Sequence, residues 1–343
     1  MEIIDTYSPI FVVWEVTLKC NLKCIHCGSD AGKKRAKELN TKEIIKVIND
    51  LAEIGFKGIG LMGGEVFLRK DWEIISKEIK DAGMALSLVS NGFFDPEKIV
   101  DKMIKLETDC VTIGFDGTEK VHDHIRGVKG SFRKALDFLK ASNKAGLLTN
   151  AITTVHKGNY EELPKLADLI LEKEELDWQI QEGVLIGRFP KELLLSEEEY
   201  YSLGLYIASL QEKYSKDRVV GGHSFGFFSK KIPELSLYPE WKGCYAGKMV
   251  LGISSDGNVR GCETLPEEYI EGNVRKKSVI DIWNDPNSFS YNRKFSTDQL
   301  GPLCKNCKHG EQCKGGCMVR SVSTTGKPHN DPKCFYRFEK ELK

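Results

Sequence analysis

The sequence predicts an α/β fold built on a parallel sheet. Strand-like and helix-like segments alternate through the first two thirds of the 343-residue chain, and the loops between them are short. Repeated strand–helix units of this kind place their strands in parallel. Polar or glycine-rich motifs recur where the strands end, and in parallel folds this edge carries the active site. Six such units predict a partial (β/α)6 barrel, and an open sheet is the alternative.

Each element is predicted from its own pattern. Residues 11–17 form an apolar, β-branched run that stops at the first group of cysteines. Asn40 and Glu43 are a capping signal for a helix that continues to about residue 54 and has a regular apolar face. The other expected strands are 59–62, 85–90, 110–115, 147–155 and 178–181, and the other expected helices are 72–82, 96–106, 132–144, 160–171 and 196–214.

The composition narrows the classes of function. Lysine plus arginine and aspartate plus glutamate number 50 each, so no net charge favours nucleic acid or an anionic membrane as a partner. The apolar runs are too short to span a bilayer, and no secretory signal is recognisable, so we expect a cytoplasmic protein. Eleven cysteines in that reducing compartment indicate metal or iron–sulfur ligation rather than disulfides.

Cys20, Cys24 and Cys27 form a C-x3-C-x2-C group directly after the first strand. Three thiolates on one short loop can hold three irons of a [4Fe–4S] cubane and leave the fourth iron open to a small chelating cofactor. A zinc site completed by His26 is the alternative. Structural zinc prefers four ligands, and His26 stands between two of the cysteines, where it is poorly placed to reach the same ion.

This cysteine group resembles the signature of the radical SAM superfamily. The resemblance covers about residues 10–235. It implies that S-adenosylmethionine (SAM) binds the open iron and that one electron from the cluster cleaves SAM to methionine and a 5′-deoxyadenosyl radical. That radical removes a hydrogen atom from the substrate. The residues that the resemblance places around SAM are Gly63, Gly64, Glu65, Ser90, Asn91, Asp116 and Arg126.

The resemblance gives several of these residues a role. The run 63–65 ends the second strand and is similar to the family's motif for the SAM amino group. Two glycines let the backbone approach a ligand, and a carboxylate complements an ammonium. Arg126 is expected to pair with the SAM carboxylate, and Ser90 and Asn91 are expected to meet the ribose or the methionine.

A second set of cysteines lies toward the C-terminus. Its members are Cys244, Cys262, Cys304, Cys307, Cys313, Cys317 and Cys334. The first two read C-x12-G-x4-C around Asp256-Gly257, which predicts a hairpin, and the next four read C-x2-C-x5-C-x3-C. The pattern resembles the SPASM domain, a C-terminal extension of some radical SAM enzymes that binds two auxiliary [4Fe–4S] clusters.

The resemblance also implies how these cysteines are shared. One auxiliary cluster takes Cys304, Cys307, Cys313 and Cys334, and the other takes Cys244, Cys262 and Cys317. Three [4Fe–4S] clusters are therefore expected in all. The last of them lacks a fourth cysteine, so it has an open iron or a non-cysteine ligand. Two zinc ribbons are the alternative, but seven cysteines after a radical SAM core favour iron–sulfur.

The chain is expected to divide into a radical SAM core, residues 1–235, and a SPASM domain, residues 236–343. Glu263 follows Cys262 directly and is a candidate catalytic base, because the matching position in a sulfatase-maturing relative is acidic. A solvated turn residue is the alternative at this position. Cys110 belongs to neither pattern and is expected to be a buried core thiol.

SPASM enzymes mostly act on peptides or proteins, so the leading hypothesis is oxidative maturation of a ribosomally made peptide through a thioether, a carbon–carbon crosslink or a similar change. The short segment before the first strand leaves no room for a leader-binding domain, so a separate protein is expected to supply one, unless the peptide binds differently. A flavodoxin- or ferredoxin-type electron donor is expected. The alternatives are a small-molecule radical SAM decarboxylase or dehydrogenase, sulfatase-maturase-like protein oxidation, and a zinc-binding module without catalysis.

Overall fold

One ten-stranded, mostly parallel sheet organises the computed structural model, which describes residues 8–222, 224–236 and 242–342. The strand order is β10-β9-β8-β1-β2-β3-β4-β5-β6-β7. Strands β1 to β7 pair in parallel in chain order, and β8 pairs in parallel with β1. The strands are β1 (Phe11–Thr17), β2 (Gly58–Gly63), β3 (Ala85–Ser90), β4 (Cys110–Gly114), β5 (Thr149–Val155), β6 (Asp177–Glu182), β7 (Val219–Gly221), β8 (Val250–Ile253), β9 (Asn258–Arg260) and β10 (Gly272–Asn273).

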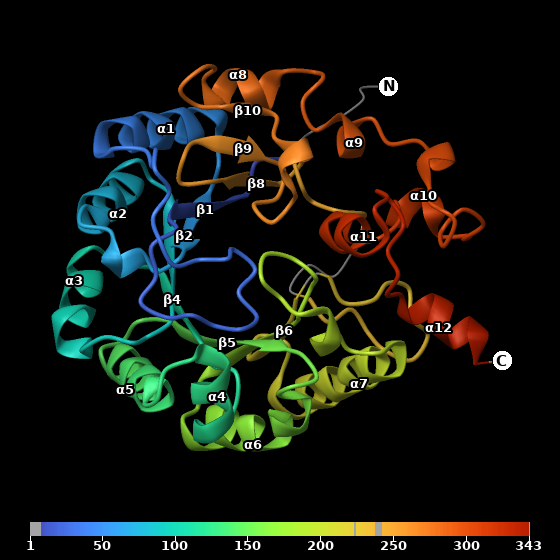
Figure 1. Ribbon diagram of the computed structural model, residues 1–343, viewed down its shortest axis with the longest axis horizontal. Helices are drawn as coiled ribbons and strands as arrows, with labels where there is room; N and C mark the ends of the chain where they lie inside the picture. Colours follow the sequence, from blue (N-terminus) through green and yellow to red (C-terminus); the bar gives the residue numbers. More distant parts are fainter. Residues whose placement is uncertain (1–7, 223, 237–241, 343) are drawn as a thin grey trace.

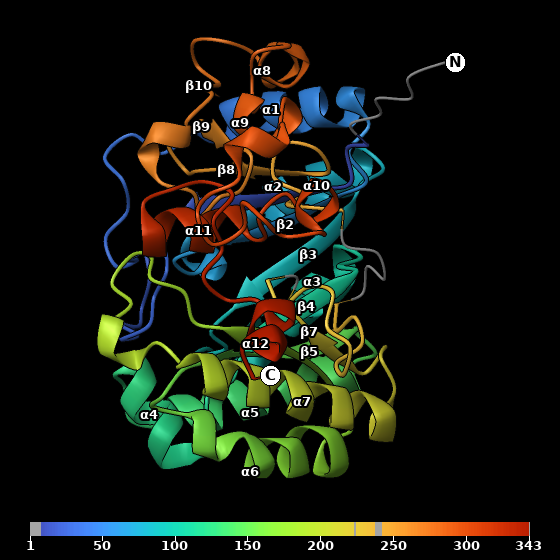
Figure 2. The ribbon, with the colours of Figure 1, turned by 90° about the vertical axis from the view of Figure 1, so that its right-hand side faces the viewer.

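The sheet curves into a partial barrel, with helices on its outer side. Figure 1 shows α1 to α7 around the strands and the C-terminal helices α10, α11 and α12 on the remaining side of the ring, and Figure 2 gives the side view. The helices are α1 (Thr41–Ile54), α2 (Trp72–Asp81), α3 (Val100–Lys105), α4 (Glu119–Arg126), α5 (Ser131–Lys144), α6 (Leu163–Ala167), α7 (Glu197–Tyr214), α8 (Val279–Asn284), α9 (Ser290–Arg293), α10 (Gly310–Cys313), α11 (Met318–Thr325) and α12 (Phe335–Glu341). No helix in the described ranges has the length and apolar character needed to cross a bilayer.

Helix α1 shows how local sequence fixes an element. The Asn40 side chain accepts a hydrogen bond from the Glu43 N–H at 3.1 Å, and the Glu43 carboxylate accepts one from the Asn40 N–H at 2.8 Å. This reciprocal capping satisfies two donors that a helix start leaves free. Gly55 ends the helix with φ of 100°, a conformation that glycine adopts without steric cost. The face toward the sheet consists of Ile44, Val47, Ile48 and Leu51, all buried.

Two of the predicted helices are interrupted. The segment 96–106 is a 3-10 turn at Pro96–Lys98 followed by α3, and the segment 160–171 divides into a 3-10 turn, α6 and a π-helical stretch at Asp168–Lys173. The sequence missed α4, because only His122, Ile125 and Arg126 of its eight residues are buried. A helix whose buried face includes a histidine and an arginine lacks the apolar periodicity that indicates helix.

The predicted C-terminal hairpin is confirmed, and it extends the main sheet. Strands β8 and β9 are antiparallel, and Gly257 in their turn has φ of 88°. Strand β8 also pairs with β1, from Phe11 opposite Val250 to Trp14 opposite Ile253. The sheet therefore includes strands from both sides of residue 235, near which a domain boundary was expected. That boundary stays a prediction.

A buried ionic network ties the C-terminal part of the chain to the end of β6. Arg320 on α11 lies 2.6 Å from a Glu182 carboxylate oxygen and 2.7 Å from one of Asp331, and all three side chains are at most 3% exposed. Lys333 contributes a fourth charge, 3.4 Å from Glu182. Removal of one partner from a buried ion pair commonly costs about 3–5 kcal/mol. This network therefore fixes α11 against the barrel.

Candidate functional site

The first three cysteines lie on the loop after β1, at the carboxyl edge of the sheet. The Cys20 N–H donates to the Gly32 carbonyl at 3.0 Å, and the Gly32 N–H donates to the Leu18 carbonyl at 2.9 Å, so the loop closes on its own backbone. Its middle is tied to α4 by the Ile25 N–H, which donates to the Ile125 carbonyl at 2.9 Å. The cysteines are therefore presented by a fixed loop.

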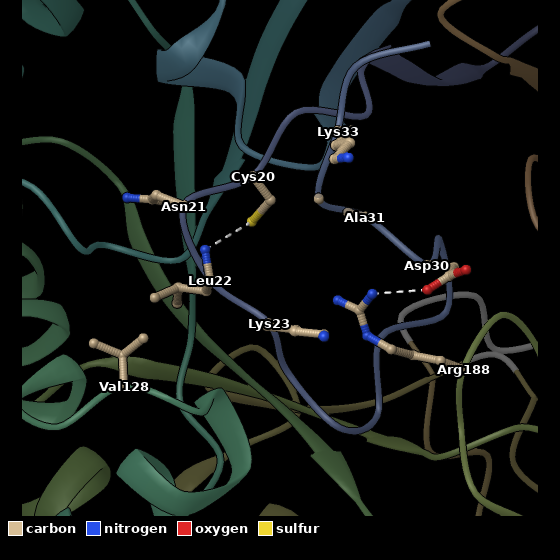
Figure 3. Close-up of a pocket in the computed structure, with 10 residues that line it drawn as sticks. Cys20, Asn21, Leu22, Lys23, Asp30, Ala31, Lys33, Val128 and Arg188 are labelled. Carbon is tan, nitrogen blue, oxygen red and sulfur yellow. Dashed lines mark hydrogen bonds and ion pairs between the residues drawn. The ribbon is translucent and has the colours of Figure 1, made fainter.

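Arg188, on the segment after β6, holds this loop from the opposite side. Its Nε donates to the Cys24 carbonyl at 2.8 Å, and its Nη1 lies 2.7 Å from an Asp30 carboxylate oxygen. Figure 3 shows this ion pair beside a cavity of ≈ 470 Å³ that Cys20 and other loop residues also line. The contacts of Arg188 therefore clamp the cysteine loop.

The sulfur atoms of the loop lie in a desolvated setting. Burial raises the pKa of Cys20 to about 11, although the Leu22 N–H donates to its Sγ at 3.4 Å. Burial also raises the pKa of Cys24, against the opposing effect of the Arg126 guanidinium, whose Nη1 lies 3.9 Å from the sulfur. Negative charge on Cys24 and Cys27 raises the pKa of Cys20 further. Neighbouring thiolates in such a site need a cation to stabilise them, as bound iron does.

Asp116 is the centre of a buried charge cluster beneath the loop. Its carboxylate lies 2.5 Å from Nη2 of Arg126 and 3.5 Å from Nε2 of His26, and it accepts a hydrogen bond from the Thr154 N–H at 3.1 Å. Burial acts to raise the pKa of Asp116, but Arg126 prevails and holds it at about 2. Burial lowers the pKa of His26 to about 4, so its ring is neutral at pH 7. The His26 side chain therefore contacts Asp116. This position agrees with the expectation that His26 is poorly placed to complete a zinc site with the cysteines.

Arg126 is therefore committed within the protein, to Asp116 and to the Cys24 sulfur. The cluster links the cysteine loop, the end of β4 and α4 through a single side chain. Its predicted contact with the SAM carboxylate stays a prediction. Any anion that it binds shares the guanidinium with Asp116.

Glu65 connects the ends of β2 and β3. Its fully buried carboxylate accepts hydrogen bonds from Ser90 Oγ at 2.9 Å and from the Asn91 N–H at 2.8 Å. Burial raises its pKa to about 7, although these hydrogen bonds oppose the shift. The Asn91 side chain continues to the cysteine loop, where its Nδ2 lies 2.8 Å from Asn21 Oδ1 and 3.8 Å from the Cys20 sulfur. These contacts bring three of the predicted SAM residues to the cysteine loop.

The glycines of the 63–65 run pack against the backbone of the cysteine loop, and their predicted contact with SAM stays a prediction. A Cβ atom on Gly63 would lie 2.3 Å from the Thr17 carbonyl oxygen, and one on Gly64 would lie 2.2 Å from the Lys19 carbonyl oxygen. Residues with side chains are therefore excluded because the chain's own backbone passes there. The glycines permit the start of the cysteine loop to pack on the end of β2.

The C-terminal cysteines gather in two places. Cys244, Cys262 and Cys317 pack in one small apolar cluster with Ala246, Leu265, Met318 and Val319. Burial raises the pKa of each of the three thiols, and the charge on Cys244 raises it further for Cys262 and Cys317. Burial likewise raises the pKa of Cys304 to about 12, with added effects from Cys334 and Cys307. The two groups contain six of the seven expected ligands, and the assignment of all seven cysteines to clusters stays a prediction.

The donors in both sets are cysteine thiols. Within residues 8–222, 224–236 and 242–342, no three His, Cys, Asp or Glu side chains converge as the ligands of one metal ion would. Thiolate donors suit iron–sulfur clusters and zinc.

Glu263 is buried, so the expected alternative of a solvated turn residue is wrong. Its side chain is 7% exposed, and its Oε1 lies 3.9 Å from Nη1 of Arg260. Burial raises its pKa to about 8, and the nearby Glu15 carboxylate adds to the shift. The carboxyl group is thus mostly protonated at pH 7. Its role as a base stays a prediction, and it requires conditions that ionise this group.

Sequence reasoning missed Glu15 and the contacts that it collects. Arg35 binds its carboxylate through two nitrogens at 2.8 and 2.9 Å, and Ser255 Oγ donates to it at 2.7 Å. These residues join β1, the cysteine loop and the β8–β9 turn. The signal was present in the sequence, because Glu15 is the one acidic residue in the apolar run 11–17. A buried charge in such a strand requires a partner.

Two family models match separate parts of the chain, and each part contains cysteines of one of the two groups. Residues 14–170 match the Radical SAM superfamily, and residues 244–308 match SPASM, described as an iron–sulfur cluster-binding domain.

Individual relatives cover almost the whole chain. The AdoMet-dependent heme synthase of Methanosarcina barkeri is 29% identical over 97% of this chain and 98% of its own length. The mycofactocin maturase MftC of Mycobacterium ulcerans is 28% identical over 95% of this chain and 88% of its own. The crystal structure of Streptococcus suis SuiB bound to S-adenosylmethionine superposes with a TM-score of 0.74, at 18% identity, over 95% of this chain and 76% of that one. This last likeness supports the fold.

The buried carboxyl of Glu263 makes stability depend on pH. Its pKa in the folded chain is about 8, above the ordinary value of 4.5, so folding favours the protonated form and the stability that it contributes is lost as the pH rises from about 4.5 through 8. We expect Glu263→Gln to gain stability relative to the unmodified chain over this interval. Thermal melting of both metal-free proteins from pH 5 to pH 8.5 measures it. The control is Glu268→Gln, at an exposed position nearby. If the difference in melting temperature between Glu263→Gln and the parent chain is the same at every pH, the assigned pKa shift is contradicted.

Proposed function

This chain is a radical SAM enzyme with a SPASM domain at its C-terminus, and we propose that it oxidatively modifies a peptide. Both domains imply iron–sulfur clusters, and the first implies SAM. The observation that carries the proposal is the three-cysteine loop beside a cavity with cationic side chains. The cysteine patterns support three [4Fe–4S] clusters, one that binds SAM and two auxiliary.

Cys20, Cys24 and Cys27 would hold the SAM-binding cluster, which supplies the electron that cleaves SAM. The protein's own residues do the positioning. Asn91 reaches from the end of β3 to within 3.8 Å of the Cys20 sulfur, and Arg126 reaches from α4 to within 3.9 Å of the Cys24 sulfur. These two polar side chains border the loop where a ligand with an amine, a carboxylate and a ribose would lie.

The cavity beside the loop favours an anionic substrate. Lys23, Lys33 and Arg188 line it, together with one carboxylate, Asp30, which is already paired with Arg188 (Figure 3). Among the residues that the structure describes, no carboxylate forms an ion pair with Lys23 or Lys33 at this wall. A peptide with acidic residues complements such a surface. The relative from Bradyrhizobium diazoefficiens that is named a PqqA peptide cyclase supports a peptide as the substrate.

A haem precursor is the second candidate. The relative named as a heme synthase spans nearly the whole of both chains, and the carboxylates of a tetrapyrrole would complement the same lysines. A crosslink in a peptide and a change to a haem precursor both require that the substrate lose electrons. An auxiliary cluster held by Cys244, Cys262 and Cys317 is suited to accept the second of them.

The remaining partners follow from the same chemistry. A flavodoxin- or ferredoxin-type protein supplies the electron for SAM cleavage in the cytoplasm, where iron–sulfur clusters and free thiols persist. For a ribosomally made peptide, a separate protein presents the leader sequence.

Iron content separates the proposed clusters. Anaerobic reconstitution should give about twelve irons per chain. Replacement of Cys20, Cys24 and Cys27 by alanine should leave about eight and abolish release of 5′-deoxyadenosine on reduction, because SAM loses its anchor. Iron and sulfide analysis with chromatography of SAM products checks both results. Replacement of Cys110, which belongs to neither pattern, by alanine is the control and should change neither. A value near four irons with tightly bound zinc would sink the auxiliary-cluster assignment, and 5′-deoxyadenosine from the triple variant would sink the SAM site.

The substrate class is tested by offering both candidates to the reduced enzyme with SAM. Mass spectrometry should show that the peptide encoded nearest the enzyme's gene loses two hydrogens. 5′-Deoxyadenosine should form in a matching amount. Lys33→Ala should raise KM for an anionic substrate several-fold by removing a charge from the cavity wall, whereas Lys42→Ala, an exposed position on α1, should not. If the peptide is unaltered while a haem precursor triggers stoichiometric SAM cleavage, the peptide hypothesis is replaced by the second candidate.

A further inference from the structure

The hydroxyl group of Tyr291 is buried in the C-terminal part of the chain. It is one of the buried polar atoms without a hydrogen-bond partner in the described ranges. A phenol is a good hydrogen-bond donor, and burial of a hydroxyl without a partner is unfavourable. Such a group in a well-packed region indicates that its partner is one that the polypeptide alone does not supply.

The hydroxyl lies between the two segments that carry Cys244 and Cys262. A Cβ atom built on Gly261, the residue before Cys262, would lie 2.2 Å from the Tyr291 Oη. The same Cβ would lie 2.8 Å from the Gly247 nitrogen and 2.9 Å from the Ala246 carbonyl carbon, which follow Cys244 closely in the chain. The Gly247 N–H donates to the Gly261 carbonyl at 3.2 Å, so the two segments touch where the hydroxyl lies.

Contacts on every side fix this position. Asn292, next in the chain, donates from its Nδ2 to the carbonyls of Cys244 and Ala246, both at 2.7 Å. His329 Nε2 lies 2.7 Å from the Tyr291 carbonyl oxygen. The Tyr269 ring packs edge-on against the Tyr291 ring, with 5.1 Å between centroids. The phenol ring also packs in the apolar cluster that contains Cys244, Cys262 and Cys317.

We propose that the Tyr291 hydroxyl donates a hydrogen bond to a cysteine thiolate of the auxiliary cluster held by Cys244, Cys262 and Cys317. This inference rests on the proposed function, because it needs that cluster to be present. Thiolate sulfur accepts hydrogen bonds, and the phenol packs in the same apolar cluster as Cys244 and Cys262. The assignment gives the orphaned donor a partner, and the absence of a side chain at Gly261 leaves room for the hydroxyl.

The hydrogen bond has a consequence for electron transfer. Reduction adds negative charge to an iron–sulfur cluster, and a donor aimed at its thiolate stabilises the reduced form more than the oxidised form. Tyr291 therefore raises the reduction potential of this cluster and makes it a better acceptor for the electron that leaves the substrate. Tyr291 is a positioning and tuning residue, since it acts through the cluster.

The test is a reductive titration followed by electron paramagnetic resonance. It uses the full-length chain in the Cys20, Cys24 and Cys27 alanine background, so that only the auxiliary clusters contribute. Tyr291→Phe should lower the potential of one auxiliary cluster, leave the other unchanged and keep the iron content of the parent. Tyr269→Phe, which alters the neighbouring ring, is the matched control and should shift neither potential.

Three results would overturn the inference. An unchanged potential in Tyr291→Phe means that the hydroxyl does not interact with the cluster. Loss of one iron from Tyr291→Phe means that the oxygen is a ligand and not a hydrogen-bond donor. A parent chain without auxiliary iron contradicts the proposed clusters themselves, and this outcome is seen in the iron analysis before any potential is measured.

Discussion

The pair formed by Asp116 and Arg126 is the interaction on which the site depends. It is an ion pair of 2.5 Å between side chains that are 1% and 10% exposed, at the centre of the barrel's carboxyl edge. Asp116 contacts His26 of the cysteine loop, and Arg126 contacts the Cys24 sulfur of the same loop. A buried charge without its partner is costly, commonly by about 3–5 kcal/mol, so each member holds the other in place. The loop rests on that pair.

The same edge gathers the remaining parts of the site because parallel strands end together. Glu65 ties β2 to β3, Asn91 joins β3 to the cysteine loop, and Arg188 clamps the loop from the segment after β6. The C-terminal part reaches the site by two routes, through the pairing of β8 with β1 and through the network of Arg320 with Glu182. The C-terminal cysteines are thereby attached to the same sheet as the first cysteine loop.

Much of this arrangement could be predicted from the sequence. Cysteine spacing and repeated strand–helix units carry their signals locally, so the fold class, the strands and the two cysteine groups were predicted, and residues 14–170 and 244–308 match the Radical SAM and SPASM families. The packing of Gly63 and Gly64 against the backbone of residues 17–19 was missed, because nothing in the sequence reveals that this segment passes over them.

Other features depend on partners that are distant in the chain. Helix α4 was missed because its buried face includes His122 and Arg126, which read as polar until Asp116 is known to lie beneath them. The burial of Glu263 could not be foreseen, because it follows from the packing of its backbone against Gly252 on the neighbouring strand. Tertiary contacts of this kind leave no periodic pattern in the sequence.

Hydrogen exchange of the cysteine loop tests most directly whether the buried pair positions the site. In the metal-free chain, Asp116→Asn removes one charge, leaves Arg126 buried without its partner and should accelerate amide exchange across residues 18–32, including the Ile25 amide that binds the Ile125 carbonyl. The amides of β1 should keep their protection. Glu119→Gln, which breaks an exposed ion pair with Arg133 on the neighbouring helices, should leave the loop unchanged. Equal exchange of the loop in Asp116→Asn and in the parent chain would contradict the account.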